Sequence, residues 1–372
     1  MSRTHTLALA VVLLVAGCGQ PFSNSELILE GQDQQYLQLL PRPAELRLDI
    51  LGEEAAVAED IGQLTQALEH RCGGRDGGDH VRPPRPPPPE PPPPRESRLV
   101  CATLLFASGV NAAMVKWLSV VDVVTRHKPT SRTENSRRWG PTPKKDGLDW
   151  RLDLERSGNV FTWNISFAVT GTPADADAWR QIVSGVVEGD RLGRRGLGEI
   201  TFDLDAAQVF GSASQGLIHA SYDHTTCKRS MHLQFEGYVG EAAAKAKHPP
   251  APLDAVHYYE RNCEGGGKLE WAYLEDIHAR FAPDQSCAES IRLTTRWDDS
   301  GAGRGDFIID GGDLVFGRIQ GSQCWNDQLR PVWRDGPDSL FWHLEKGNRD
   351  ACVYDDRAEP TEVTLPTAPC DG

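Results

Sequence analysis

Strict alternation of apolar and polar residues in two adjacent segments constrains the fold of this chain more than any other feature. Every second side chain is apolar in residues 148–155 (LDWRLDLE), and residues 160–169 (VFTWNISFAV) repeat the pattern. A period of two places the apolar side chains on one face of a β-strand and the polar ones on the other. The turn residues Ser157-Gly158-Asn159 lie between the segments. The sequence therefore predicts a β-hairpin in an antiparallel sheet with one buried face.

Similar patterns continue along the second half of the chain. A short helix is expected over residues 175–187, and no repeat of fixed period is visible, which argues against a propeller or a solenoid. We expect further strands over residues 197–204, 216–222, 230–239, 254–262, 268–275, 289–298, 305–310, 313–319 and 339–345.

One long apolar segment precedes most of these strands. Residues 99–124 are apolar on nearly every side of a helix, but Asn111, Lys116 and Asp122 interrupt them. A helix of this kind is usually buried in protein, so we expect a packed helix over residues 103–125 rather than a membrane span. The predicted fold class is mainly β (α+β): a large curved antiparallel sheet, a half-barrel meander, that wraps one long apolar helix.

The N-terminal segment has the features of an export signal. An apolar run over residues 7–17 is too short to cross a bilayer, and its small final residues lead directly into Cys18. This segment resembles the lipobox of bacterial lipoproteins. The resemblance implies cleavage after Gly17, a lipid anchor on Cys18 and, because Gly19 rather than Asp follows, placement in the outer membrane. A cleaved signal peptide with a chance cysteine is the alternative.

The cysteine count fits an exported protein. Of nine cysteines, Cys18 is the predicted lipid anchor, and the remaining eight can form four disulfides in an oxidising compartment. The disulfide candidates are Cys72, Cys101, Cys227, Cys263, Cys287, Cys324, Cys352 and Cys370. A zinc site is not expected, because the sequence contains no C-x₂-C pair.

The expected strands narrow the pairing. If the strands over residues 230–239 and 254–262 are antiparallel neighbours, Cys227 and Cys263 come close enough to form a bridge. The other predicted pairs are Cys324–Cys352, which flank a compact Trp-rich segment, Cys72–Cys101, which flank a proline tract, and Cys287–Cys370, by elimination only.

Composition divides the chain into four parts. Residues 83–94 are nearly all proline and should form a polyproline II segment. We interpret this segment as a stiff spacer, and a PxxP ligand for a partner module is the alternative. The predicted parts are a lipoprotein signal peptide (1–17), an acidic N-terminal segment with a candidate helix (18–72), a Gly/Pro-rich linker or loop (73–98) and a β-rich main domain (99–372).

Charge and motifs limit the function classes. The formal net charge is −14, whereas a nucleic-acid-binding protein needs a basic surface, so we expect no nucleic-acid partner. The sequence contains no G-x-S-x-G, no H-E-x-x-H and no glycine-rich phosphate loop. We therefore expect no cofactor and no metal, and we prefer a non-enzymatic role.

The densest polar stretch, residues 296–313 (RWDDSGAGRGDFIIDGGD), places five aspartates among glycines. They are Asp298, Asp299, Asp306, Asp310 and Asp313. Carboxylates on loops suit Ca²⁺, but the spacing matches no calcium motif, and Asp and Gly are also the usual residues of turns. We favour turns, with a Ca²⁺-dependent interaction module as an alternative, and we give little weight to the tripeptide Arg304-Gly305-Asp306.

Four histidines, His219, His224, His232 and His257, fall on or beside three adjacent predicted strands. One interpretation is a metal cluster or a general base, which makes an envelope hydrolase acting through Asp and His the main enzymatic alternative. The other is a set of scattered surface or core residues, because a shift of one residue in register moves a side chain to the other face.

Several segments of the chain resemble a group of uncharacterised bacterial outer-membrane lipoproteins. The likeness covers roughly residues 100–355, and its segments are SRRWGP, GEITFDLDAA, RLTTRWDDSGAGRGDFIIDGGDL, SQCWNDQLRPVW and RDACVY. It implies a β-rich fold and supports the Cys324–Cys352 pair, but it implies no activity. A looser resemblance is to half-barrel lipoprotein carriers, whose curved sheets take acyl chains on the concave face.

The expected protein is a lipid-anchored lipoprotein of the cell outer membrane with a structural or binding role. Its expected partners are the membrane, through the lipid on Cys18, and a hydrophobic ligand or an envelope protein. If the helix over residues 103–125 fills the concavity of the sheet, a structural role is expected. If it leaves an apolar groove, we expect the protein to carry a hydrophobic ligand.

Overall fold

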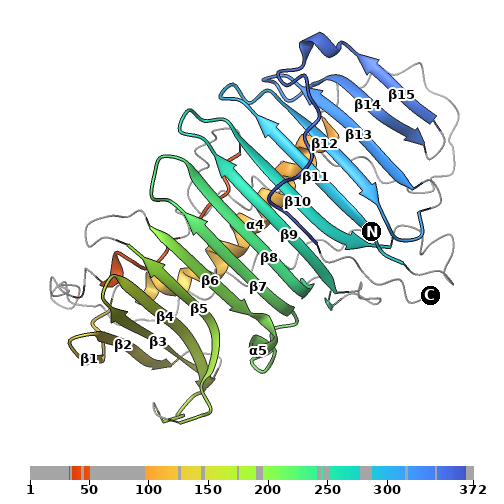
Figure 1. The fold of residues 1–372 in the computed structure, drawn as a ribbon. Helices are drawn as coiled ribbons and strands as arrows, with labels where there is room; N and C mark the ends of the chain where they lie inside the picture. Colours follow the sequence, from red (N-terminus) through yellow and green to blue (C-terminus); the bar gives the residue numbers. More distant parts are fainter. Residues whose placement is uncertain are drawn as a thin grey trace, which may run out of the picture.

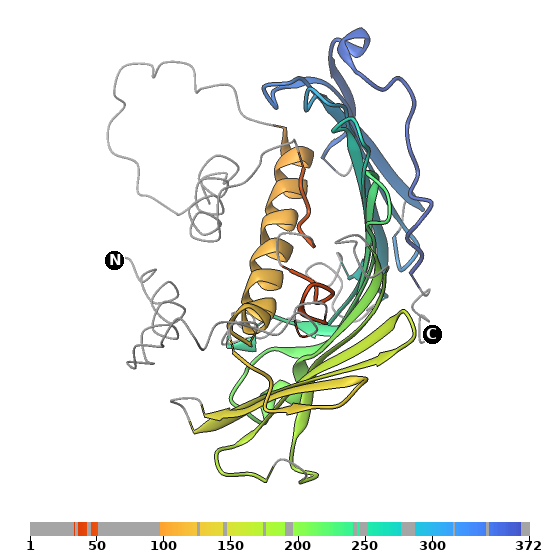
Figure 2. The same ribbon diagram turned by 90° about the vertical axis from the view of Figure 1, so that its left-hand side faces the viewer.

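One antiparallel sheet of 15 strands dominates the fold, and strands that follow each other in the chain are neighbours in the sheet (Figure 1). The sheet curves, so that it has a concave and a convex face (Figure 2). In this computed structural model the described residues are 33, 36–42, 46–50, 97–124, 127–143, 147–173, 176–189, 196–240, 244–245, 252–276, 287–314, 317–339 and 342–365. The strands are β1 (Ser131–Arg132), β2 (Ser136–Pro143), β3 (Leu148–Ser157), β4 (Val160–Val169), β5 (Arg180–Glu188), β6 (Leu197–Asp203), β7 (Gln215–Asp223), β8 (Arg229–Val239), β9 (Leu253–Arg261), β10 (Gly267–Glu275), β11 (Glu289–Trp297), β12 (Gly303–Asp310), β13 (Arg318–Trp325), β14 (Pro331–Ser339) and β15 (Trp342–Gly347).

The alternating segments form the predicted hairpin, β3 and β4. Leu152 lies opposite Ile165, and Leu154 lies opposite Trp163. All four side chains are almost fully buried, as the period of two requires. Gly158 occupies the turn with a φ of 64°, a conformation that glycine adopts without a steric penalty. The prediction of a mainly β, antiparallel fold is therefore confirmed.

The predicted helix over residues 175–187 is wrong, because most of that range belongs to β5. The apolar residues Ile182, Val183 and Val187 are buried in the sheet, and β-branched residues of this kind prefer strands. Gly185 lies under the indole of Trp163, where a Cβ atom would come within 2.5 Å. The sequence prediction also missed β1, β2, β14 and a five-residue helix, α5 (Leu204–Gln208).

Helix α4 (Arg98–Val124) lies along the concave side of the sheet (Figures 1 and 2). A helix that is apolar nearly all round is not supported, because Thr103, Ser108 and Asn111 are polar and buried. Within the described part of the chain, no helix is long and apolar enough to cross a membrane. The helix is instead one-sided, and its buried apolar side chains are Val100, Cys101, Ala107, Val110, Met114, Leu118 and Val121.

An N-terminal stretch fills part of the concavity beside α4. The side chains of Tyr36, Leu40 and Leu46 belong to the main hydrophobic core. The amide of Asn111 donates to the Leu48 carbonyl at 3.0 Å, and its oxygen accepts from the Leu48 N–H at 2.8 Å. The described part of residues 36–50 therefore contributes to the same hydrophobic core as α4 and the sheet. The signal peptide, Cys18, the candidate helix and the proline tract lie outside the described residues.

A C-terminal strap, residues 353–365, crosses the convex face (Figure 1). Glu270 on β10 accepts hydrogen bonds from the backbone N–H groups of Thr361 at 3.0 Å and Glu362 at 2.8 Å. Val363 packs against Val256 and Ala272. The outward side chains of β9 and β10 are therefore partly covered rather than fully hydrated.

Two predicted disulfides are present, Cys227–Cys263 and Cys324–Cys352. The first joins the ends of β8 and β9, as the strand argument predicts. Cys101 and Cys287 are also disulfide-bonded. Their predicted partners, Cys72 and Cys370, lie outside the described residues.

Candidate ligand-binding cavity

A cavity of about 1060 Å³ opens between α4 and the concave face of the sheet. This volume lies just above the range of about 300–1,000 Å³ that is usual for small-molecule sites. The helix does not fill the concavity beside β6–β10. This is the arrangement under which the sequence leads us to expect a hydrophobic ligand. The walls of the cavity are mainly apolar, with Leu105, Phe106 and Met114 from α4 and Leu233, Phe235 and Trp271 from the strands.

Strand register brings one row of side chains into the cavity. Leu233 on β8 lies opposite His257 on β9, and His257 lies opposite Trp271 on β10. Because side chains alternate along a strand, Phe235 and Tyr273 face the same side two residues further on. The alternation of side chains along β8, β9 and β10 therefore places these residues together in the wall of the cavity.

His257 lies in this wall among aromatic rings. The Phe106 ring stacks on the imidazole with 4.1 Å between the ring centroids and 8° between the planes. Phe235 and Trp271 approach it edge-on, at 5.2 and 6.0 Å. Burial, with a smaller contribution from the nearby His232, lowers the pKa of His257 to about 3, so the ring is neutral at pH 7. Its buried Nδ1 has no hydrogen-bond partner in the described structure.

The polar groups at the outer end of the cavity are acidic or neutral. Asp254, Glu275 and Asp276 line it there, and no Lys or Arg is among the described residues that line it. Burial raises the pKa of Tyr238 and of Tyr273, and the negative charge of Glu275 and a hydrogen bond to it raise the pKa of Tyr273 further, so both hydroxyls stay neutral at pH 7. The cavity is therefore apolar inside and negatively charged at its edge.

A group of three carboxylates lies beside this edge. Asp276, Glu289 and Asp313 each offer an oxygen atom, and these atoms lie within 4.8 Å of one another. Each residue also has a further partner within the chain. We assign no metal to the group, because a cluster of acidic side chains alone does not define a metal site.

The five aspartates of residues 296–313 do not form one site. Asp298 caps the turn between β11 and β12, where it accepts from the Ser300 N–H at 3.0 Å. Asp310 pairs with Arg292 near the other end of β12. Of the five, only Asp313 belongs to the carboxylate group. The turn interpretation thus holds for Asp298, whereas Asp306 lies within a strand and is only 2% exposed.

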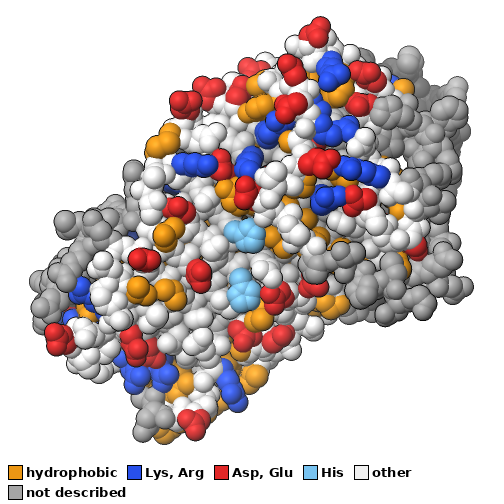
Figure 3. All heavy atoms as spheres, in the orientation of Figure 1, with side chains coloured by type: hydrophobic (Ala, Val, Ile, Leu, Met, Phe, Trp, Pro, Cys, Tyr) orange, Lys and Arg blue, Asp and Glu red, His pale blue; other side chains and the backbone are white. Residues whose placement is uncertain are grey.

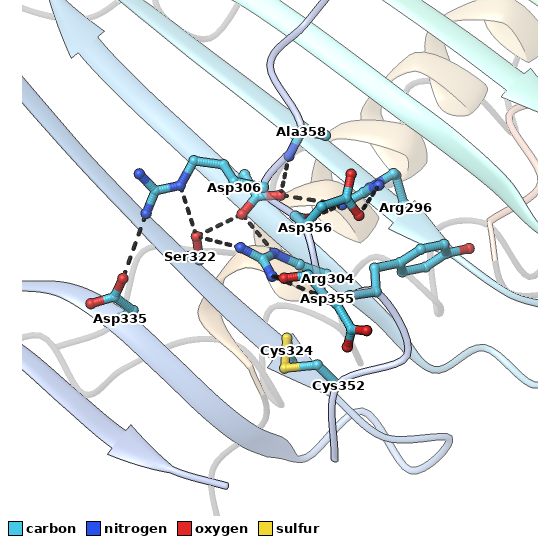
Figure 4. Close-up of polar contacts among 12 residues, drawn as sticks. Arg296, Arg304, Asp306, Ser322, Cys324, Asp335, Cys352, Asp355, Asp356 and Ala358 are labelled. Carbon is cyan, nitrogen blue, oxygen red and sulfur yellow. Dashed lines mark hydrogen bonds and ion pairs between the residues drawn. A yellow bond between two sulfur atoms is a disulfide. The ribbon is translucent and has the colours of Figure 1, made fainter. Parts of the chain in front are cut away.

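Asp306 belongs to a polar cluster on the convex face with Arg304 and Ser322 (Figure 4). Arg304 Nε donates to Asp306 Oδ1 at 2.8 Å, and the Ser322 hydroxyl donates to the same oxygen at 2.6 Å. Arg304 also donates to the strap carbonyls of Tyr354 and Asp355, at 3.1 and 2.9 Å. These contacts hold the strap on the sheet. They also bury the tripeptide Arg304-Gly305-Asp306, so it is not an exposed adhesion loop.

The four histidines do not converge. His219 Nδ1 forms a hydrogen bond with the Thr201 hydroxyl at 3.0 Å, and both side chains lie on the convex face. His232 lies on the same face beside the strap. His224 follows β7, and its pKa falls to about 4, because of burial first and the nearby Arg229 second. Only His257 faces the cavity. Its aromatic partner Phe106 was not predicted, because the sequence does not determine which face of α4 meets the sheet.

The convex face, with the strap that crosses it, presents a mixed surface. Acidic and basic side chains lie interspersed over its upper half, and histidines are visible near its centre (Figure 3). This pattern is typical of a solvated sheet face and contrasts with the apolar cavity on the other side of the sheet.

Comparison with known proteins identifies no relative: no family model, no curated protein and no solved structure matches the chain.

Proposed function

We propose that this protein is a lipid-anchored envelope lipoprotein of the outer membrane, attached through Cys18, which binds a hydrophobic ligand on the concave side of its sheet. The observation that carries the proposal is the open apolar cavity of about 1060 Å³ between α4 and the strands. The looser likeness to half-barrel lipoprotein carriers is consistent with this role. A structural role is not favoured, because a packed core normally contains few voids larger than a water molecule.

The driving force for such binding is the hydrophobic effect. Each Å² of apolar surface that leaves water contributes roughly 25 cal/mol. Side chains such as Leu233, Phe235 and Trp271 already face the cavity, and strands and a helix hold them in position. A ligand would therefore gain this free energy with little loss of conformational entropy in the protein.

Gly109 offers a direct test. It lies on α4 at the cavity, and no atom other than its chain neighbours and the backbone of its own helix lies within 4 Å of the position that a Cβ would take. We expect Gly109→Trp to place an indole in the cavity and to weaken binding of the neutral fluorescent probe N-phenyl-1-naphthylamine by about tenfold, or about 1.4 kcal/mol. Gly109→Ala is the matched control, because it also replaces the helical glycine but adds only one methyl group.

Fluorescence titration of the purified full chain measures both variants. The proposal holds if the wild-type protein and Gly109→Ala bind the probe and Gly109→Trp binds it weakly. Equal binding by all three proteins, or no binding by any of them, would refute a ligand site between α4 and the sheet.

The anchor is tested separately. In cells supplied with labelled palmitate, the wild-type chain should incorporate label and Cys18→Ser should not, because the thiol that carries the lipid is lost. Label that persists in Cys18→Ser would contradict anchoring at this position.

A further inference from the structure

We infer that the cavity selects an uncharged amphiphile, an apolar molecule with one hydroxyl or amide group, and that His257 binds this group. The inference rests on the proposed function and adds the chemical class of the ligand. It depends on three features of the cavity: the unpartnered imidazole, the aromatic rings around it, and the charge at the edge.

The imidazole is a polar group that lies among aromatic rings in the wall of the cavity. A neutral imidazole has one N–H donor and one acceptor nitrogen, and a buried polar atom without a partner costs about 1–3 kcal/mol. His257 is 94% buried, as its exposed fraction of 6% shows, and its Nδ1 is enclosed without a partner in the described structure. The other ring nitrogen, Nε2, also has no hydrogen bond among the described residues but is not fully enclosed, so it is the nitrogen that a ligand can reach. A ligand hydroxyl or amide can donate or accept, so it can hydrogen-bond to Nε2 in either tautomer.

The neighbouring rings hold the imidazole in place. Phe106 stacks on one of its faces, and Trp271 and Phe235 contact it edge-on. These rings offer apolar contact but no strong acceptor, so the imidazole is positioned and left for a partner from the cavity. The polar group of the ligand would therefore lie against the wall of β9, and its apolar part would fill the space lined by Leu233 and Met114.

The charge at the edge excludes the common anionic lipids. Asp254, Glu275 and Asp276 line the cavity, and none of the described lining residues is Lys or Arg. A carboxylate or phosphate head group would meet like charges there, and like charges repel more strongly where water is displaced. A neutral His257 supplies no compensating positive charge. A fatty acid anion or a phospholipid should therefore bind less well than a neutral alcohol.

Three probes of equal chain length separate these chemistries: dodecan-1-ol, dodecane and dodecanoate. Each competes with N-phenyl-1-naphthylamine for the purified full chain at pH 8. In the wild-type protein, dodecan-1-ol should displace the fluorescent probe at lower concentrations than dodecanoate. His257→Phe should weaken dodecan-1-ol binding by about tenfold, the loss of one buried hydrogen bond, and leave dodecane binding unchanged.

The variant is chosen to keep the shape of the wall. A phenyl ring can stack on Phe106 as the imidazole does, and it has neither of the two ring nitrogens. His232→Phe is the matched control, because His232 lies on the neighbouring strand β8 and on the convex face. The control should bind all three probes like the wild-type protein.

Failure of the inference differs from failure of the proposed function. If Gly109→Trp blocks the fluorescent probe, but His257→Phe binds dodecan-1-ol as tightly as the wild-type protein, the role of His257 is refuted and the ligand site stands. If dodecanoate binds more tightly than dodecan-1-ol, the proposed ligand class is refuted and the ligand site stands. If Gly109→Trp leaves every affinity unchanged, the ligand site itself is refuted.

Discussion

The two faces of the sheet bury polar side chains in opposite ways. On the convex face, Arg304 and Asp306 are each 2% exposed, and they share hydrogen bonds with each other, with Ser322 and with the strap. On the concave face, His257 is 6% exposed among aromatic rings, and its Nδ1 has no partner. The convex cluster is complete within the protein, whereas the concave wall leaves hydrogen-bonding capacity unused.

This difference separates a structural site from the proposed ligand site. A buried charged pair whose hydrogen bonds are all made holds two segments in one arrangement, here the strap and β12. A polar group that remains accessible beside an open cavity can instead hydrogen-bond to a ligand, and a purely apolar ligand would leave it without a partner. Burial of a polar group alone therefore does not indicate function. What distinguishes the two sites is whether the hydrogen-bond partners of the buried polar group come from the chain itself.

The largest expected effect comes from breaking the convex cluster. Asp306→Ala leaves Arg304 buried without its carboxylate, and loss of one partner from a buried ion pair usually costs about 3–5 kcal/mol. Urea unfolding measures the loss. Asp356→Ala is the control, because Asp356 is 78% exposed and its pair with Arg296 should contribute at most about 1 kcal/mol. Equal losses in both variants would show that the convex cluster is not the anchor we describe.

The second-largest loss of stability is expected from removing the disulfide Cys324–Cys352. Replacing Cys324 and Cys352 by Ala opens a loop with a sequence separation of 28, which should cost about 3 kcal/mol. Cys227–Cys263 has a separation of 36 and serves as the comparison. Both residues of that bridge are exposed, whereas Cys324 is fully buried beside Trp333, so the buried pair should lose more. Unfolding of the two double variants measures the difference, and a smaller loss for the buried pair would contradict it.

The smallest effect concerns the concave face and depends on pH. The pKa of His257 is about 3 in the folded protein and near 6.5 in the unfolded chain, so below pH 6.5 the unfolded chain binds a proton that the folded protein does not. Stability therefore falls as the pH falls from 7 to 5, by about 2 kcal/mol for this residue. His224, with a pKa of about 4, adds in the same direction.

His257→Phe isolates the contribution of His257. The variant should lose about 2 kcal/mol less than the wild-type protein between pH 7 and pH 5, as measured by urea unfolding at the two pH values. At pH 7 it should be at least as stable as the wild-type protein, because it removes an unpartnered polar atom. An unchanged dependence on pH would show that His257 is hydrated rather than enclosed.

Much of the fold could be predicted from residue patterns. The alternation in β3 and β4 predicted the hairpin, and the position of Cys227 before one strand and Cys263 after the next predicted their bridge. β5 was missed because Arg180–Glu188 alternates poorly: adjacent residues Ile182 and Val183 are both buried. Irregular register at this strand disturbs the period on which the prediction depends.

The candidate site could be predicted only in part. His257 was among the candidate residues, but so were three histidines that do not face the cavity. Phe106 and Gly109 were not candidates, because an apolar helix gives little indication of which residues meet the sheet. Asp306 fell within an expected strand over residues 305–310 but was also counted among turn aspartates, since the pattern of Asp and Gly around it is the same in exposed turns and in this buried strand.

Local sequence determined the elements that depend on neighbouring residues: the alternating strands, their antiparallel turns and the proximity of Cys227 and Cys263. Only the tertiary structure decided how the curved sheet meets α4, and with it the cavity, the face to which His257 belongs and the strap over Asp306. The physical reason is the range of the interactions. Strand periodicity acts over a few residues, whereas Phe106 and His257 are 151 positions apart in the chain and meet only when the sheet curves around the helix.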